Sequence, residues 1–191
     1  MEAVRSRALG SLAVLAVAVA AVATVGGCAS LPLPGTPDES LVVISTTVVS
    51  ESWPAGDGIR RVAGGQIHLT VGTGGRDIVV SFAPGTRYVA LAVAPGQYYV
   101  KRVVLDMENT NPNGRKNTWQ SQHDVSATFY CGANSVQILS RGLVVVRSGP
   151  EGWNVTLNNP IVAQDRRQIG DALKADRRWP AWEEYQLVNS E

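Results

Sequence analysis

The chain has 191 residues, of which 17 are Lys or Arg and 16 are Asp or Glu, so its formal net charge is +1. A charge this close to zero argues against a nucleic-acid binder that depends on a general basic field, and we expect no nucleic-acid partner. A hydrophobic content of 45% with 17% charged residues excludes wholesale disorder. Two cysteines are too few for a small fold held by a disulfide framework, and the length fits one domain.

The first 27 residues have the anatomy of a secretory signal. Arg5 and Arg7 form a short basic region, and residues 8–25 contain no charge. Small residues then lead to a cysteine, in the run Val25-Gly26-Gly27-Cys28. This order is typical of a signal peptide, which leaves residues 28–191 as the mature chain. The alternative is an uncleaved membrane helix, because the uncharged stretch just reaches spanning length.

The run Val25-Gly26-Gly27-Cys28 resembles a bacterial lipobox, so the chain is similar to a bacterial lipoprotein precursor. The resemblance implies that signal peptidase II cleaves between Gly27 and Cys28. It also implies a diacylglycerol on the Cys28 thiol and often an acyl chain on the new amino group. The commonest lipobox differs from this one at its first two positions, here Val and Gly. Because Ala29 is not Asp, the family's sorting pattern implies the outer membrane where a cell has two membranes.

The mature chain divides into three parts by composition. Residues 28–39 carry three prolines and are predicted to be a flexible, extended tether between the lipid and the domain. Residues 40–160 alternate short Val- and Ile-rich runs with Gly, Pro and Asn, so we expect a β-sandwich domain there. Residues 161–191 are expected to form a C-terminal helix and an aromatic tail that pack on the sandwich.

Nine runs within residues 40–160 have the length and spacing of strands. The run 66–71 alternates apolar and polar side chains, as a strand with one solvated face does. The spacing predicts a mainly β fold, an antiparallel sandwich of about seven to nine strands. The expected strands are 41–50, 66–71, 77–82, 87–93, 97–105, 126–130, 135–139, 142–147 and 152–157.

The last thirty residues change character. Asp165 is predicted to cap a helix over residues 166–178 that ends before Pro180. We expect this helix and the aromatic residues after it to cover the open end of the sandwich. The segment 165–178 has five basic and three acidic residues, which leaves a peptidoglycan, membrane-surface or partner-docking role as the alternative. The residues expected on the buried helix face are Ile169, Ala172 and Leu173.

A second resemblance rests on the run Pro95-Gly96-Gln97-Tyr98. Residues 89–100 are similar to the Pro-Gly-x-Tyr hairpin of transthyretin-like and carboxypeptidase-regulatory-like β-sandwiches, which recurs in small bacterial lipoproteins. Pro95 presets one turn residue and Gly96 can adopt a positive φ. Tyr98 is expected to return into the sheet with its hydroxyl near the edge of the sheet. The resemblance bears on fold class and implies no activity.

Cys131 is the only thiol left once Cys28 carries lipid, so no intramolecular disulfide is available. We expect a buried, inert thiol at a strand end, with intermolecular pairing, redox pairing or catalysis as alternatives. A catalytic cysteine would need a base and an orienting group, for which His123 and Asp124 are the nearest candidates. His68 is expected on a strand and His123 in a loop, both solvated. Neither has the ligand spacing of a metal site, so no metal is predicted.

The segment 109–120 is rich in asparagine and glutamine. Amides stand where a calcium loop has carboxylates, and Arg115 and Lys116 add positive charge, so we predict a turn cluster and no calcium site. With Trp119 this loop is the best candidate for a recognition surface, because exposed loops often carry binding residues. The amide residues at the positions of calcium ligands are Asn109, Asn111, Asn113 and Gln120.

These observations predict a membrane-anchored lipoprotein that acts as a non-catalytic binding or envelope-assembly module, displayed in the periplasm or outside the cell. Its expected partners are the membrane, through the lipid on Cys28, and an envelope protein. No cofactor is expected beyond the covalent diacylglycerol and N-acyl lipid. Two other functions stay open: an enzyme with a site around Cys131, His123 and Asp124, and a carrier that holds a small apolar ligand between its sheets.

Overall fold

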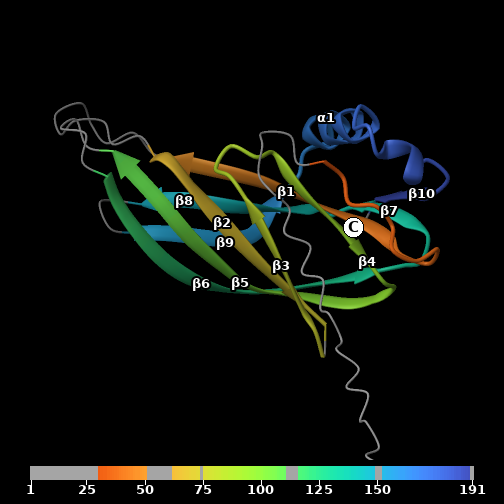
Figure 1. Cartoon of the computed structure of the whole chain (residues 1–191), viewed down its shortest axis with the longest axis horizontal. Helices are drawn as coiled ribbons and strands as arrows, with labels where there is room; N and C mark the ends of the chain where they lie inside the picture. The colour runs from red at the N-terminus through yellow and green to blue at the C-terminus, as the bar shows by residue number, and fades with distance from the viewer. Residues whose placement is uncertain (1–29, 51–61, 74, 111–115, 149–151, 190–191) are drawn as a thin grey trace, which may run out of the picture.

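Two β-sheets pack face to face, and one α-helix lies on the outer side of one of them (Figure 1). The computed structural model describes residues 30–50, 62–73, 75–110, 116–148 and 152–189. This architecture confirms the mainly β, sandwich-like fold. The predicted signal segment and Cys28 lie outside the described residues. Within the described part of the chain, no helix is long and apolar enough to cross a bilayer.

Each of the nine predicted strands overlaps an observed strand, and a tenth strand follows the helix. The tenth strand lies in the C-terminal tail, for which the sequence predicts only aromatic packing. In chain order the elements are β1 (Ser40–Ser50), β2 (Val62–Gly72), β3 (Asp77–Phe82), β4 (Tyr88–Val93), β5 (Gly96–Thr110), β6 (Lys116–Cys131), β7 (Ser135–Ile138), β8 (Arg141–Ser148), β9 (Gly152–Pro160), α1 (Ala163–Lys174), a 3-10 turn (Trp179–Ala181) and β10 (Gln186–Asn189).

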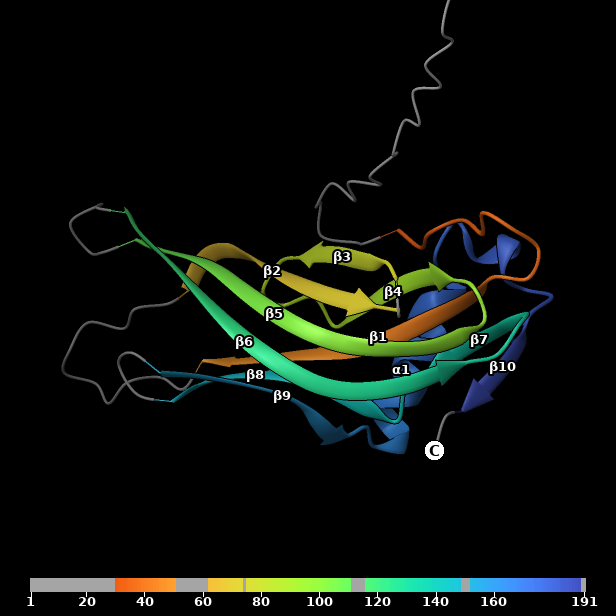
Figure 2. The ribbon, with the colours of Figure 1, turned by 90° about the horizontal axis from the view of Figure 1, so that it is seen from below.

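The four-stranded sheet is antiparallel throughout, in the order β3-β2-β5-β6. Its β5–β6 hairpin is long: Gly96 pairs with Cys131 at one end and Thr110 with Lys116 at the other. Both strands exceed the predicted lengths, and at the added described positions Met107, Trp119 and Val125 face the first core while polar side chains such as Asp106 and Gln120 are exposed. The hairpin runs along most of the sandwich (Figure 2).

The six-stranded sheet is mixed, so the prediction of a wholly antiparallel sandwich is wrong for this half. β1 pairs antiparallel with β4 on one side, and parallel with β7 and then β8 on the other. β10 adds in parallel to β7, and β9 adds antiparallel to β8. Periodicity in the sequence reports which side chains are buried, but it does not report which distant strand each one pairs with.

The first core lies between the two sheets. The strands of both sheets contribute every second residue to it, as the two-residue period of a strand requires. These side chains form one continuous cluster of buried residues. The largest fully buried members are Ile44, Ile67, Leu69, Leu105, Met107 and Leu143.

A second core lies on the outer face of the six-stranded sheet, under α1 and the 3-10 turn. β1 supplies both cores: Val42 and Ile44 point between the sheets, whereas Leu41 and Val43 point to the outer side. A strand with consecutive buried apolar residues needs cover on both faces. The buried residues of the second core are Leu31, Leu41, Val43, Val136, Ile138, Ile169, Leu173 and Trp182.

The C-terminal segment therefore covers a sheet face, and the prediction that it closes the open end of the sandwich is wrong. The N-cap residue of α1 is Val162, so Asp165 lies in the first turn and does not cap the helix. The helix ends earlier than predicted, and Pro180 belongs to the 3-10 turn beyond it. Two of the residues expected on the buried helix face are buried, Ile169 and Leu173. The third, Ala172, is exposed.

Leu31 and Pro32 are docked against the C-terminal segment, which corrects the predicted flexible tether at these two positions, whereas residues 28 and 29 lie outside the described residues. Leu31 is fully buried in the second core. Its amide N–H donates to Asp176 Oδ2 at 3.1 Å, and its carbonyl oxygen accepts from Arg178 Nη1 at 2.9 Å. The indole N–H of Trp182 donates to the carbonyl oxygen of Pro32 at 2.8 Å. We call these five residues the N-terminal clamp.

The run around Pro95 joins strands of different sheets, because β4 pairs with β1 and β5 pairs with β2 and β6. The predicted hairpin is thus an arch between the sheets. Gly96 has a φ of +156°. Tyr98 is buried, stacks on Phe129 with ring centroids 5.6 Å apart, and donates its hydroxyl to the carbonyl oxygen of Ala94 at 2.7 Å. The hydroxyl therefore fixes the arch while the ring joins the first core.

We expect Trp182→Ala to lower the free energy of unfolding by about 3–5 kcal/mol, because it removes the largest side chain of the second core and the donor to Pro32. Urea denaturation followed by far-UV circular dichroism measures this loss. Trp179→Ala is the matched control, since Trp179 is only partly buried, and should cost less. A loss below about 1 kcal/mol for Trp182→Ala would contradict the packing described here.

Candidate functional site

The three residues of the predicted enzyme site all lie on β6, but they do not meet. Cys131 is fully buried at the end of the strand, opposite Gly96. His123 faces inward eight residues earlier, which is about 26 Å along a strand. Asp124 is exposed on the other face, where its Oδ1 lies 3.8 Å from Arg102 Nε. The structure therefore brings neither the imidazole nor the carboxylate to the thiol.

The surroundings of Cys131 favour a neutral thiol. Burial raises its pKa above the ordinary 9.0, and a hydrogen bond with Ser40 lowers it by less. Ser40 is itself buried, donates its hydroxyl to the carbonyl oxygen of Gly132 at 2.7 Å, and accepts from the Ser135 N–H at 2.9 Å. The start of β1, the end of β6 and the start of β7 are thus tied together. The sequence offers no signal for this serine network, because it depends on the pairing of distant strands.

The two histidines lie on opposite faces of the four-stranded sheet. His68 is half-buried on the outer face of β2, with Nδ1 at 2.6 Å from Ser81 Oγ. His123 is half-buried on β6, with Nε2 at 3.1 Å from Ser121 Oγ, so its predicted place in a solvated loop is wrong. Across the described residues, no three His, Cys, Asp or Glu side chains lie close enough together to hold a metal ion.

The described residues of the predicted recognition loop lie in strands. Asn109 is in β5, whereas Asn111 and Asn113 lie outside the described residues. Trp119 is in β6 and packs against the first core, which corrects its placement in a loop. Its ring stacks on Trp153 of β9, with centroids 6.5 Å apart and an interplanar angle of 24°. This pair joins the edge strands of the two sheets.

The ends of several strands gather at one end of the sandwich, which we call the rim. Asn109 of β5 pairs with Asn117 of β6 and with Val62 of β2, and in the other sheet Ser148 of β8 pairs with Gly152 of β9. Figures 1 and 2 show these ends together, on the side of the molecule away from α1 and β10. The stacked tryptophans lie just inside the rim, so they give it a packed base.

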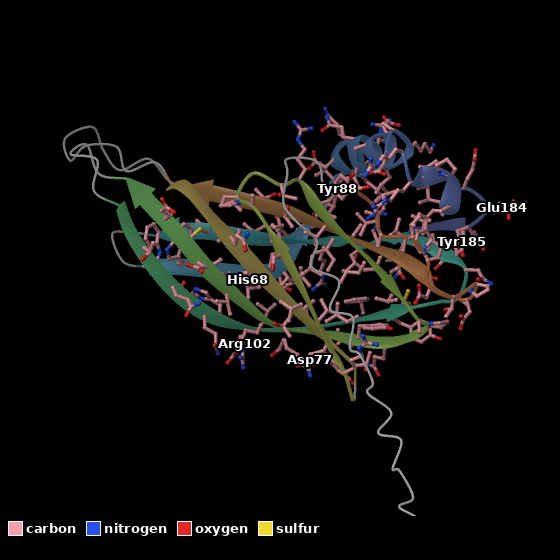
Figure 3. All side chains as sticks on the ribbon, viewed as in Figure 1. His68, Asp77, Tyr88, Arg102, Glu184 and Tyr185 are labelled. Carbon is pink, nitrogen blue, oxygen red and sulfur yellow. The ribbon has the colours of Figure 1, made fainter. Side chains whose placement is uncertain are left out.

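The outer face of the four-stranded sheet carries charged and aromatic groups that the sequence analysis does not single out. A β-bulge in β5 turns both Lys101 and Arg102 to this face, because the register against both neighbouring strands shifts there. Lys101 forms an ion pair with Asp77 of β3. Figure 3 labels Asp77 and Arg102 on this side of the molecule. Tyr99 and Tyr130 are exposed on the same face, by 40% and 68%. Since a bulge breaks the two-residue alternation, a pattern search misses this cluster.

The chain matches no protein-family model, no curated protein and no solved structure. Neither family membership nor the activity of a relative therefore defines its function. The similarity of residues 89–100 to Pro-Gly-x-Tyr sandwiches stays a resemblance, because their two strands belong to different sheets.

We expect native Cys131 to react with iodoacetamide at least about 100-fold more slowly than the urea-unfolded chain, because a buried thiol reacts only after local opening. Peptide mass spectrometry quantifies alkylation at this position separately from Cys28. Fast alkylation of the native protein, with loss of a measurable activity, would instead support the enzyme hypothesis.

The same thiol predicts a pH dependence of stability. Its folded pKa is raised, so the unfolded thiol ionises first as the pH climbs above 9.0, and the free energy of unfolding falls there. Burial also raises the pKa of Tyr98, which adds to the fall at higher pH. Urea titrations at pH 7 and pH 10 should show a smaller fall for Cys131→Ala than for the wild type. An equal fall would contradict the predicted contribution of the thiol.

Proposed function

We propose that the protein is a membrane-anchored lipoprotein, held by diacylglycerol and N-acyl lipid at Cys28, and that its domain is a non-catalytic binding or envelope-assembly module. The anchor is supported by the run Val25-Gly26-Gly27-Cys28, which comes shortly before Leu31, the first fully buried residue in the described part of the chain. The lipid attachment point thus lies immediately before the folded domain. One acyl chain holds a protein only marginally, whereas two or three chains hold it firmly.

Binding is favoured over catalysis by the placement of the reactive groups. The thiol of Cys131 is buried, the inward-facing His123 is remote from it, and the exposed Asp124 sits beside Arg102. The rim, in contrast, is formed by strand ends from both sheets and rests on the packed Trp119–Trp153 pair. Binding residues are often presented by a scaffold of packed strands. We therefore propose that an envelope protein binds at the rim.

The carrier hypothesis has less support. An apolar ligand would have to lie between the sheets, where the side chains of the first core pack against one another. The proposed location is the periplasmic or outer side of the envelope, attached to the outer membrane if the cell has two membranes, because Ala29 follows the lipidated cysteine.

We expect Cys28→Ser to abolish acyl labelling and to move the protein from the membrane fraction to the soluble fraction. Cys131→Ser is the matched control: it also removes one thiol, but it leaves the lipid attachment point and should stay in the membrane fraction. Labelling with an alkyne fatty acid, followed by fractionation and blotting, measures both properties. If Cys28→Ser matches the wild type in mobility, labelling and fractionation, the lipoprotein proposal is wrong.

Binding at the rim predicts site-specific crosslinks in cells. A photoreactive amino acid at Thr118 or Gln120, both exposed on β6 near the rim, should capture one envelope protein. The same group at Thr128, exposed near the other end of β6, serves as the control and should capture that protein weakly or not at all. Equal capture from both ends would reject the rim as the binding surface. Failure to capture any partner, together with a turnover by the purified domain, would reject the binding module.

A further inference from the structure

We propose that the helical side of the domain, formed by Leu33, α1 and the turn after it, lies on the surface of an anionic bilayer. This inference rests on the proposed lipid at Cys28 and adds an orientation to it. The four-stranded sheet then faces away from the membrane. The occupant of this surface is the headgroup layer of the membrane that holds the lipid.

The chain between the proposed lipid attachment point and the folded domain is short. Cys28 and Leu31 are three residues apart, so their Cα atoms can be separated by at most about 11 Å even in a fully extended chain. Leu31 cannot leave the domain to lengthen this connection, because it is fully buried and both of its backbone polar groups are bonded within the N-terminal clamp. The bilayer surface must therefore lie close to the clamp.

The order of the layers places the N-terminal clamp on the helical side of the molecule. The clamp belongs to the second core, on the outer face of the six-stranded sheet, and the four-stranded sheet packs on the opposite face of that same sheet. Stacked sheets are about 10 Å apart, so the outer face of the four-stranded sheet is farther from the clamp than that spacing. Of the two outer sides of the molecule, only the helical side can reach the bilayer through so short a connection.

The helical side presents an exposed apolar residue and several basic residues. Leu33 follows the clamp and is 58% exposed, so it presents an apolar group to the interface. Lys174 and Arg177 are exposed next to Arg178, and the one acidic residue among them, Asp176, bonds the Leu31 N–H. Positive charge beside a lipid attachment point is complementary to anionic headgroups. Arg166 and Arg167 add two basic residues to α1, where Asp165 and Asp171 are also exposed, so segment 165–178 keeps an excess of two positive charges.

Two acidic residues farther along the tail set the tilt of the helical side on the bilayer. Glu183 and Glu184 are exposed after Trp182, and Figure 3 places Glu184 at one end of the molecule. Anionic headgroups would repel these carboxylates. The C-terminal end of α1, with Lys174, should therefore lie nearest the bilayer, and Glu184 should point away from the bilayer. The rim lies at the other end of the sandwich, where it stays accessible to a protein partner.

Depth-dependent fluorescence quenching tests this orientation on the full lipidated chain, in vesicles of phosphatidylcholine and phosphatidylglycerol. A fluorophore is attached to Leu33→Cys or to Val79→Cys, each in a Cys131→Ala background. The two positions are matched aliphatic residues, 58% and 56% exposed, and Val79 lies on the outer face of the four-stranded sheet. Headgroup-nitroxide lipids should quench the label at position 33 several-fold more than the label at position 79.

The outcomes separate this inference from the proposed function. If the protein floats with the vesicles and both labels are quenched equally, the orientation is wrong while the lipid anchor stands. If the protein does not float with the vesicles at all, the anchor itself is wrong. A Gly-Ser insertion of twelve residues between Ser30 and Leu31 should narrow the difference between the labels, because such a linker spans about 20 Å. A difference that survives the insertion unchanged would contradict the role of the short connection.

Discussion

The burial of β1 on both faces is the constraint on which the rest of the structure depends. Leu41, Val42, Val43 and Ile44 are consecutive and all fully buried, so two of them point to each side of the six-stranded sheet. An antiparallel sandwich with one solvated face per sheet cannot satisfy such a strand. A third layer is required, and α1 supplies it together with the 3-10 turn.

This third layer also determines where the folded chain begins. Leu31 and Trp182 complete the second core from opposite ends of the sequence, and the hydrogen bonds of the clamp join residues about 150 positions apart. The prolines in the segment lack an N–H and favour extended backbone, so the carbonyl oxygen of Pro32 is free to accept the Trp182 indole. A segment whose composition is typical of a linker therefore becomes part of the core. Under the proposed lipid attachment at Cys28, this docking would hold the domain close to the membrane.

The same topology separates the groups from which an enzyme site could have been built. His123 and Asp124 are neighbours in sequence, but a strand sends their side chains to opposite faces, and Cys131 belongs to the serine network where β1, β6 and β7 meet. The rim and the outer face of the four-stranded sheet are among the accessible surfaces of the described residues. Arg102 and the exposed Tyr99 and Tyr130 lie on that face beside the bulge in β5. The exposed ion pair of Arg102 contributes little stability, so Arg102 is available for contacts, as are the two exposed tyrosines.

Local sequence patterns were enough to predict the mainly β class, the approximate positions of nine strands, the buried face of α1 through Ile169 and Leu173, and the burial of Cys131, but not the full extents of β5 and β6. These features depend on local periodicity and on the preference of apolar side chains for the interior, both of which can be read from neighbouring residues. The parallel pairing of β1 with β7 and β8, the arch at Pro95, the placement of Trp119 against Trp153, and the docking of Leu31 depend on the tertiary fold. Each of these depends on contacts between residues far apart in the chain. Local patterns contain no information on such contacts, because the same apolar side chain can be buried equally well by many partners.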